Sequence, residues 1–299
     1  MRRATPCLLA LWRPVLPCLL MLAMLSAAGP ARAQSPDGEP VVLSTGEPGG
    51  AYWSAGARLQ AVATDMGFTV QHLPSAGSME NLERLLASDS PVGLVFAQGD
   101  ALQRYFDAHP DAEQKVDVLE NVGRECVFMM VERGTGIRDD DDLQARAAGL
   151  SLAIGSEVSG VAVTFDYMRS LVPELGDITV AYTDTRVAME RIRQGADSVN
   201  AVMVVHRPRE HSSELDIAIA NPARFHLVRF SDERFLRRLS GGRKVYRQMR
   251  LALPGVEEPV TTLCVRALLV AHKTKLTMRQ RNKLTDLVNY HWMRVYTSP

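Results

Sequence analysis

The sequence predicts an α/β protein whose sheet is mainly parallel. Short apolar runs alternate with segments of helical periodicity, and this alternation occurs three times between Val41 and Phe106. It recurs from Leu150 onward, so the second half repeats the first. Turns rich in Gly, Ser and Thr follow the apolar runs in both halves. Because ligands of open α/β sheets bind beyond the carboxyl ends of the strands, these turns are the expected site.

The elements of the first half follow from apolar periodicity and from turn residues such as Gly67 and Asp89-Ser90-Pro91. In chain order we expect strand 41–43, helix 52–66, strand 68–73, a helix with Ser78 as its N-cap, strand 92–96, a helix carrying Leu102 and Tyr105, and a longer strand 126–131.

The elements of the second half follow from the same signals. In chain order we expect a helix begun by the acidic run 139–142, strand 150–154, helix 161–171, strand 178–182, a cap at 183–185 with its helix, strand 201–205, short strands 217–220 and 225–230, a return strand 261–271 and a terminal helix from Thr277. Calcium is the alternative for run 139–142, but the spacing of an EF-hand is absent.

Residues 1–33 are typical of a secretory signal peptide. Arg2 and Arg3 form a basic start, an apolar run follows, and Ala31-Arg32-Ala33 is a small-x-small cleavage signal. The apolar run is shorter than the roughly 20 residues of a membrane span. We therefore expect cleavage after Ala33 and a mature, exported protein that begins at Gln34.

Charge and cysteine content exclude several classes of function. Removal of residues 1–33 takes away four arginines and no acidic residue, so the formal net charge moves from 0 to −4. A mildly acidic protein offers no field for nucleic acid or anionic lipid. A basic cluster is interpreted as a solvated face: Arg234, Arg237, Arg238, Arg243 and Lys244. No Cys-x-x-Cys or His-x-x-x-His occurs, so neither a metal site nor a cofactor is predicted.

Polar residues follow the strand ends in both halves. They are Thr45, Ser75, Gln98, Ser156, Thr183 and His206. Hydroxyls, amides and exposed N–H groups predominate, and no nucleophile is paired with a base, which favours binding over catalysis. The Gly-rich turn after the first strand suits carboxylate or phosphate oxygens at a helix N-terminus. The alternative is a turn that only lets strand and helix pack.

Four motifs resemble the TAXI family of TRAP-transporter solute-binding proteins. Ser44 to Tyr52 reads Ser-Thr-Gly-x-x-Gly-Gly-x-Tyr, and Pro74 to Leu82 contains Gly-Ser-x-Glu-Asn-Leu. The strand from Val92 ends in Gln-x-Asp at Asp100, and the turn 155–160 corresponds loosely to the loop that opens the second lobe. The resemblance spans essentially the whole mature chain.

The resemblance implies a type II periplasmic binding-protein fold, in which two α/β lobes are joined by hinge strands and close over a ligand cleft. We expect lobe 1 to comprise residues 34–131 and 261–299, and lobe 2 residues 132–260. The implied function is capture of a small polar ligand, such as an amino acid, dicarboxylate or oxo acid, and its delivery to a TRAP-type membrane permease. A periplasmic sensor that signals to a membrane receptor is the alternative.

The expected ligand-binding residues come from the motifs and from the strand ends. They are Thr45, Gly46, Gly49, Gly50, Tyr52, Ser75, Gly77, Ser78, Asn81, Gln98, Ser156, Ser159, Gly160, Thr183 and His206. For Tyr52 the alternative is a core residue, and for Arg207 the alternatives are an acidic ligand or solvent.

Two features separate this chain from a plain match to the family. Glu47-Pro48 replaces small residues in the first motif, and 200–208 keeps only part of an Asp-Ala-aromatic strand ending in Gly-x-Pro.

The mature chain has two cysteines, Cys126 and Cys264, which form either one disulfide or two buried thiols. Because the outgoing and returning strands of the implied fold run near each other, we expect these cysteines to lie close together.

Overall fold

The computed structural model describes residues 38–195, 199–208, 210, 212–239 and 243–296. The predicted signal peptide and its cleavage site lie outside this part of the chain. Residues from Glu39 onward form one unit, which contains all the strands and helices described here. None of the described helices combines the length and the apolar character that a membrane span requires.

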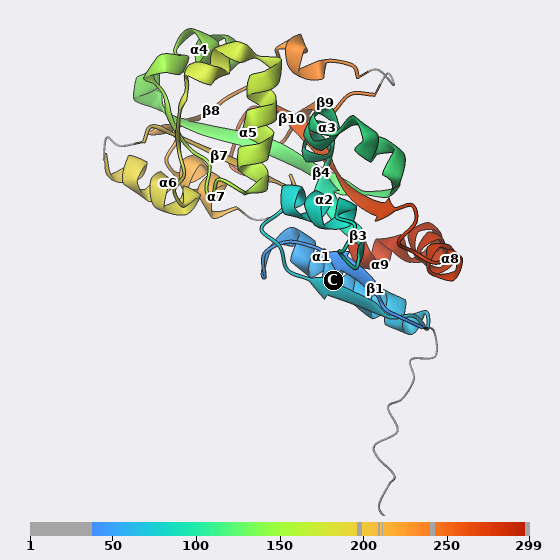
Figure 1. The fold of residues 1–299 in the computed structure, drawn as a ribbon. Coiled ribbons are helices and arrows are strands. Elements are labelled where there is room, and N and C mark those ends of the chain that lie inside the picture. Colours follow the sequence, from blue (N-terminus) through green and yellow to red (C-terminus); the bar gives the residue numbers. More distant parts are fainter. Residues whose placement is uncertain (1–37, 196–198, 209, 211, 240–242, 297–299) are drawn as a thin grey trace, which may run out of the picture. The chain divides into compact units, whose positions relative to one another are not determined.

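The described residues contain strands and helices that alternate along most of the chain (Figure 1). The strands are β1 (Val41–Ser44), β2 (Val70–Leu73), β3 (Val92–Gln98), β4 (Val116–Glu132), β5 (Ser151–Ala153), β6 (Thr179–Ala181), β7 (Ala201–His206), β8 (Phe225–Leu227), β9 (Tyr246–Leu251) and β10 (Val260–His272). The helices are α1 (Ala51–Asp65), α2 (Ser78–Leu86), α3 (Gly99–Ala108), α4 (Asp140–Ala145), α5 (Gly160–Leu171), α6 (Thr185–Gln194), α7 (Ser213–Ala220), α8 (Met278–Asp286) and α9 (Trp292–Tyr296).

The sheet contains two parallel groups of strands separated by two long antiparallel strands. The strand order is β2-β1-β3-β10-β4-β7-β5-β6, with β8 paired to β4 and β9 paired to β10. Strands β2-β1-β3 are parallel, as are β7-β5-β6. Strand β10 runs antiparallel to β3 and β4, and β4 runs antiparallel to β7. We call the β1–β3 side lobe 1 and the β5–β7 side lobe 2; β4 and β10 cross between them.

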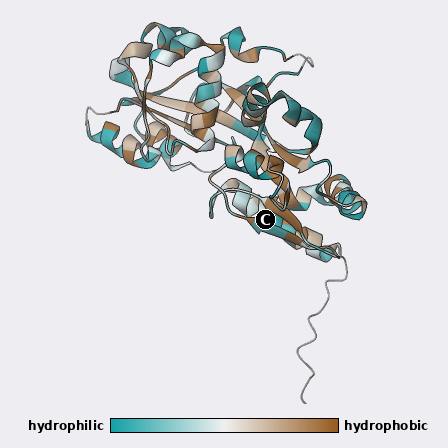
Figure 2. Cartoon of the chain, viewed as in Figure 1, coloured by the Kyte–Doolittle hydropathy of each residue, from teal (hydrophilic) through white to brown (hydrophobic). Residues whose placement is uncertain are grey.

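Each lobe buries its strands between helices on both faces, as parallel strands require. In lobe 1, Leu59 of α1 and Leu284 of α8 share a cluster with Leu43, and Leu82 and Leu85 of α2 pack on the opposite face. In lobe 2, α5 and α6 likewise contribute to separate clusters. Figure 2 shows the hydrophobic colour concentrated on the central strands and the hydrophilic colour on the surrounding helices.

Local signals explain most element boundaries. Asp139 caps α4, because its Oδ1 accepts the backbone N–H of Asp142 at 3.1 Å, so the acidic run starts a helix as predicted. Thr277 and Gln280 form a capping box at α8. No group of three or more acidic, His or Cys side chains that could hold a metal ion occurs in the described residues.

Two expectations about the fold were wrong, and one strand was missed. The sheet is mixed, because β4 and β10 run against their neighbours. Residues 217–220 belong to helix α7 and not to a strand; Ser212 caps this helix, and a four-residue apolar run cannot distinguish the two structures. Strand β9 was not expected, because its sequence is largely polar and exposed at the edge of the sheet.

Candidate functional site

The loops that end the strands of lobe 1 are tied together by Asn81. Its Nδ2 donates to the carbonyl oxygens of Thr45 at 2.6 Å and Phe96 at 2.8 Å. The hydroxyl of Thr45 donates to the Leu73 carbonyl at 2.8 Å. Both side chains are buried. Thr45 and Asn81 therefore fix the positions of the loops that surround the carboxyl ends of β1, β2 and β3.

Ser78 has a different role from the predicted N-cap. It is the first residue of α2, and Gly77, with φ at 141°, precedes the helix without a side-chain cap. Glycine suits this backbone conformation, because other residues rarely adopt it. The Ser78 Oγ instead accepts the backbone N–H of Gln98 at 3.0 Å. The hydroxyl of Ser75 accepts the N–H of Gly77 at 3.3 Å.

Glu125 of β4 is buried where the two lobes meet and is only 6% exposed. Its Oε2 accepts a hydrogen bond from Gln98 Nε2 at 3.0 Å, and the Tyr52 hydroxyl lies 3.4 Å away. The ring of Tyr52 packs on Phe96, with centroids 5.5 Å apart. Tyr52 is therefore part of the core through its ring and part of the polar site through its hydroxyl.

Burial raises the pKa of Glu125 to about 7, partly offset by the Gln98 hydrogen bond and the Arg207 charge. Burial and the negative charge of Glu125 also raise the pKa of Tyr52, so its hydroxyl stays protonated. Carboxyl groups perturbed in this way are common at functional sites. A carboxylate with a pKa close to neutrality can be ionised readily when a cationic group approaches it.

Arg207 approaches this carboxylate from lobe 2. Cys126 of β4 pairs with His206 of β7 in antiparallel register, so Glu125 and Arg207, one residue further along, come to the same level. The Arg207 side chain is 11% exposed and pairs with Glu210 at 3.1 Å. The alternative in which Arg207 points into solvent is therefore wrong. Glu125 and Arg207 therefore lie at the same level where the β4–β7 ladder ends, and the Arg207 charge lowers the pKa of Glu125.

The lobes contact each other at Gly160 and Gly77, two of the glycines that were predicted to bind the ligand. A Cβ added to Gly160, the first residue of α5, would lie 2.5 Å from Gln98 Oε1. A Cβ on Gly77 would lie 3.4 Å from the Val158 carbonyl oxygen. Gln98 and Gly77 belong to lobe 1, whereas Gly160 and Val158 belong to lobe 2. Glycine therefore permits the close approach of the two lobes here.

We expect Gly160→Ala to lower the free energy of unfolding by about 1–3 kcal/mol, the cost of leaving a buried polar group unpaired. The new methyl group must displace the Gln98 amide, which then loses its bond to Glu125. Urea unfolding of the unliganded protein measures the change. A double-mutant cycle isolates it, because Gly160→Ala should cost little in a Gln98→Ala background.

The matched control is Gly176→Ala, since a Cβ at that position meets no atom within 4 Å. An equal cost of Gly160→Ala with and without the Gln98 side chain would contradict the proposed contact.

A second buried polar group joins the lobes. Asp100 of α3 accepts hydrogen bonds at Oδ2 from Thr164 Oγ1 at 2.7 Å and from the Tyr246 hydroxyl at 3.0 Å. All three side chains are fully buried, and burial raises the pKa of Asp100. Thr164 lies on α5 and Tyr246 on β9, so this cluster holds lobe 1 to lobe 2.

Lobe 2 contains a cavity of about 420 Å³ beyond the carboxyl ends of β5 and β7. Ser159, His206 and Glu214 line it. Ser159 also caps α5, because its hydroxyl accepts the N–H of Ala162 at 3.2 Å. The Glu214 carboxylate accepts the Thr185 hydroxyl at 2.6 Å. The cavity therefore offers both hydroxyl groups and a carboxylate.

His206 presents an acceptor nitrogen. Its Nδ1 lies 2.8 Å from the carbonyl oxygen of Arg207, so Nδ1 is the donor and Nε2 carries the lone pair. Nε2 is buried and has no hydrogen-bond partner among the described residues. The ring stacks on Phe128, with centroids 4.8 Å apart. Burial lowers the pKa of His206, which keeps the ring neutral.

The other predicted residues lie in turns. The Gly46 carbonyl accepts the N–H of Ser75 at 3.2 Å, and the Thr183 carbonyl accepts that of Gly155 at 3.1 Å. Gly49, Gly50 and Ser156 are exposed. The structure thus brings together Tyr52, Gly77, Ser78, Gln98 and Gly160 at the lobe contact and places Ser159 and His206 at the lobe 2 cavity. Gly49, Gly50 and Ser156 have no described contact across the lobes.

Sequence reasoning noted Asp100 only as the end of the Gln-x-Asp motif, and it missed Glu125, Thr164, Tyr246 and Glu214. Glu125 carried a usable signal, because it is an acidic residue beside the apolar run from Cys126 to Val131. Tyr246 and Thr164 carried none, since only the tertiary fold brings them to Asp100.

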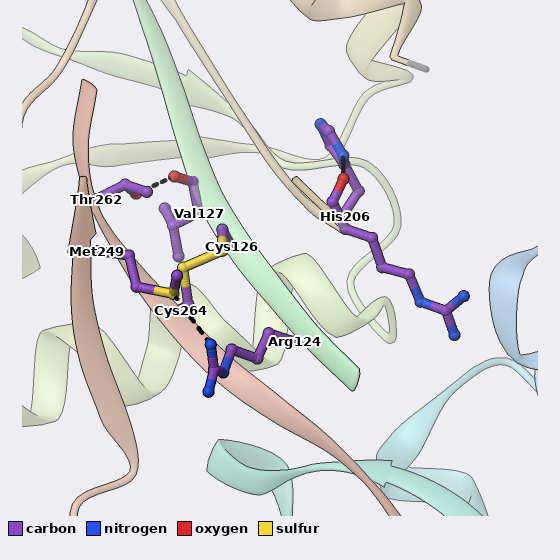
Figure 3. Close-up of a disulfide and its surroundings, with 8 residues drawn as sticks. Arg124, Cys126, Val127, His206, Met249, Thr262 and Cys264 are labelled. Atoms are coloured by element: carbon purple, nitrogen blue, oxygen red, sulfur yellow. Dashed lines mark hydrogen bonds between the residues drawn. A yellow bond between two sulfur atoms is a disulfide. The ribbon is translucent and has the colours of Figure 1, made fainter. Parts of the chain in front are cut away.

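A disulfide joins Cys126 of β4 to Cys264 of β10 at the point where both strands cross between the lobes (Figure 3). The two residues are directly opposite in the antiparallel register. Both are buried. The bond therefore connects the two crossing strands.

No model of a known protein family and no curated protein matches the sequence. Several solved structures have a similar fold. A Xanthomonas citri protein bound to ATP is 12% identical, and the match covers 87% of this chain and 88% of that one with a TM-score of 0.50. The binding component of a phosphonate ABC transporter from Pseudomonas aeruginosa is 12% identical over 86% and 78%, with a TM-score of 0.46. Lactococcal OpuAC complexed with glycine betaine is 12% identical over 85% of each chain, with a TM-score of 0.47.

The strand order identifies the class of fold. Each lobe has three parallel strands in the order second, first, third, followed by an antiparallel strand that crosses between the lobes. This is the type II periplasmic binding-protein fold, which the sequence resemblance implied.

Proposed function

We propose that the chain is a periplasmic solute-binding protein that captures a small polar ligand between its lobes and delivers it to a TRAP-type membrane permease. The observation that carries this proposal is Glu125, a buried carboxylate at the lobe contact with Arg207 at the same level. We further propose a ligand with both a carboxylate and an amine, because Arg207 suits the first group and Glu125 the second. Among the ligand classes expected from the sequence, an amino acid has both.

Other features support binding in preference to catalysis. A serine nucleophile needs a base within reach, but the Ser156 and Ser159 hydroxyls have backbone groups as their described partners. A disulfide persists in oxidising compartments, which agrees with export. The lobe boundaries near residues 131 and 260 stay part of the proposal, with β4 and β10 as hinge strands.

A set of ligands that differ by one group tests the proposal. Thermal unfolding of the mature protein is measured with glutamate and with 2-oxoglutarate, which has no amine. A second set compares a neutral amino acid with its 2-oxo acid, which has no amine, and with the matching amine, which has no carboxylate. A ligand at about 100 times its dissociation constant adds about 2.7 kcal/mol. In one of the two sets, we expect the amino acid to raise the unfolding temperature more than the ligands that lack one of its groups do. No shift with either set would contradict a small zwitterionic ligand.

We expect Glu125→Gln to weaken binding of the amino acid by about 10- to 100-fold, the usual range for a hydrogen bond to a charged group. Calorimetric titration at pH 8 measures the change. Glu120→Gln is the control, because Glu120 lies on the same strand and its carboxylate accepts the neighbouring Asn121 N–H. Equal affinities for the Glu125 variant and the unaltered protein would place the amine elsewhere.

A further inference from the structure

A second cavity, of about 750 Å³, lies beside the disulfide and is lined by cationic side chains. We call it the basic cavity. Six of its lining residues are cationic, and the lining includes no acidic residue. The six are Arg124, Arg238, Arg243, Lys244, Arg247 and Arg266.

The basic cavity faces away from the site of Glu125. Successive side chains of a strand point to opposite faces, so Arg124 and Cys126 share one face of β4 and Glu125 occupies the other. Arg266 is opposite Arg124, and Arg247 is opposite Cys264. Figure 3 shows Arg124 next to the disulfide, where its Nη1 lies 3.9 Å from the Met249 sulfur. The basic cavity is therefore distinct from the proposed solute site.

Within the described part of the chain, four of the six cationic side chains of the basic cavity form no ion pair with a carboxylate. They are Arg124, Lys244, Arg247 and Arg266. Arg243 reaches Glu113 only at 4.0 Å, with both side chains 65% exposed. Like charges directly opposite in a sheet destabilise it, as with Arg124 and Arg266. A bound anion would relieve this repulsion.

From the sequence, Arg238, Arg243 and Lys244 were interpreted as part of one solvated face with Arg234. The structure separates them, because Arg234 pairs with Asp232 at 2.7 Å and with Glu174 at 2.9 Å. Arg238, Arg243 and Lys244 instead line the basic cavity together with arginines from three strands. This convergence of distant residues was not visible in the linear sequence.

We propose that the basic cavity binds a phosphate-bearing anion with at least two negative charges. Guanidinium groups match phosphate oxygens in a bidentate manner, and five of the six cations are arginines. The volume lies within the range of about 300–1,000 Å³ that is usual for small-molecule sites. A free polyphosphate and a phospholipid head group share this chemistry.

The test measures both sources with the mature, oxidised protein. Calorimetric titration with sodium tripolyphosphate at low salt probes the free anion. Flotation with phosphatidylglycerol vesicles, compared with phosphatidylcholine vesicles, probes the lipid. Arg124→Gln/Arg266→Gln should weaken whichever binding occurs by at least about tenfold. The control is Arg186→Gln/Arg191→Gln on α6, which removes the same charge from exposed positions outside the cavity.

Each result supports or overturns the proposal. Tripolyphosphate binding that only the cavity variant loses supports a free phosphate compound, and vesicle binding lost in the same way supports a lipid head group. No binding of either probe, or equal losses in both double variants, overturns the proposal. Circular dichroism verifies that the variants fold. If the cavity variant does not, Arg247→Gln and Lys244→Gln, both exposed, replace it in the same comparison.

Discussion

Reduction of the Cys126–Cys264 disulfide should lower the free energy of unfolding by about 4–5 kcal/mol. The bond joins residues separated by 138 positions, so it closes a long loop and restricts the unfolded chain strongly. Typical domains are stable by about 5–15 kcal/mol, so the reduced protein should unfold at a much lower urea concentration.

The measurement compares urea unfolding of the mature protein with and without reductant. This chain has no cysteines other than Cys126 and Cys264 after Ala33, which leaves one bond to reduce. Cys126→Ala/Cys264→Ala is the control, and its midpoint should not respond to reductant. If reductant lowers the stability of the control as much as that of the unaltered protein, the effect does not come from the bond.

The second large effect is a decrease in the free energy of unfolding with rising pH, caused by Glu125. Burial raises the pKa of Glu125 to about 7 in the folded state, whereas an exposed Glu titrates near 4.3. Between these values the folded protein binds more protons than the unfolded chain, so stability falls as pH rises. The destabilisation is complete above pH 7 and amounts to about 4 kcal/mol. Glu125→Gln cannot ionise, so it should be more stable than the unaltered protein at pH 8 and equally stable near pH 4.

The difference in stability between the Glu125→Gln variant and the unaltered protein at each pH reports the contribution of this carboxyl group alone. Tyr52 of α1, Asp100 of α3, and Arg207 and Glu210 after β7 all influence the charge of Glu125. All of these neighbours, and His206, are present in both proteins, so their own contributions to the pH dependence cancel in the difference. Urea midpoints between pH 4 and 8 give the comparison, with Glu120→Gln as a control. A Glu125→Gln protein that is less stable at pH 8 would mean that Glu125 is ionised there and stabilised by Arg207.

The alternation of strands and helices was readable from the sequence because buried parallel strands and amphipathic helices have distinct periodicities. Its failures have local causes. The run 217–220 was too short to distinguish a helix from a strand, and β9 is too polar to be recognised. The antiparallel course of β4 and β10 depends on pairing between residues far apart in the chain, which periodicity does not report.

The candidate site was predictable to the extent that it follows strand ends. Gln98 and His206 were found because each lies at the carboxyl end of a strand. Glu125 lies within a strand, so that rule did not select it. The basic cavity was missed for a related reason, since Arg124, Arg247 and Arg266 become neighbours only when β9, β10 and β4 pair side by side.

The bonded pair of crossing strands also limits how the lobes can move. Two independent connections would allow one lobe to slide past the other as well as to rotate. Here β4 and β10 are hydrogen-bonded from Cys126–Cys264 to Val116–His272, and the disulfide fixes their register at one end. Sliding would have to break that ladder and strain the bond. In the proposed cycle of opening and closing, shear would thereby be suppressed and bending of the ladder would remain, so each closure would return Gln98 and Gly160 to the same alignment.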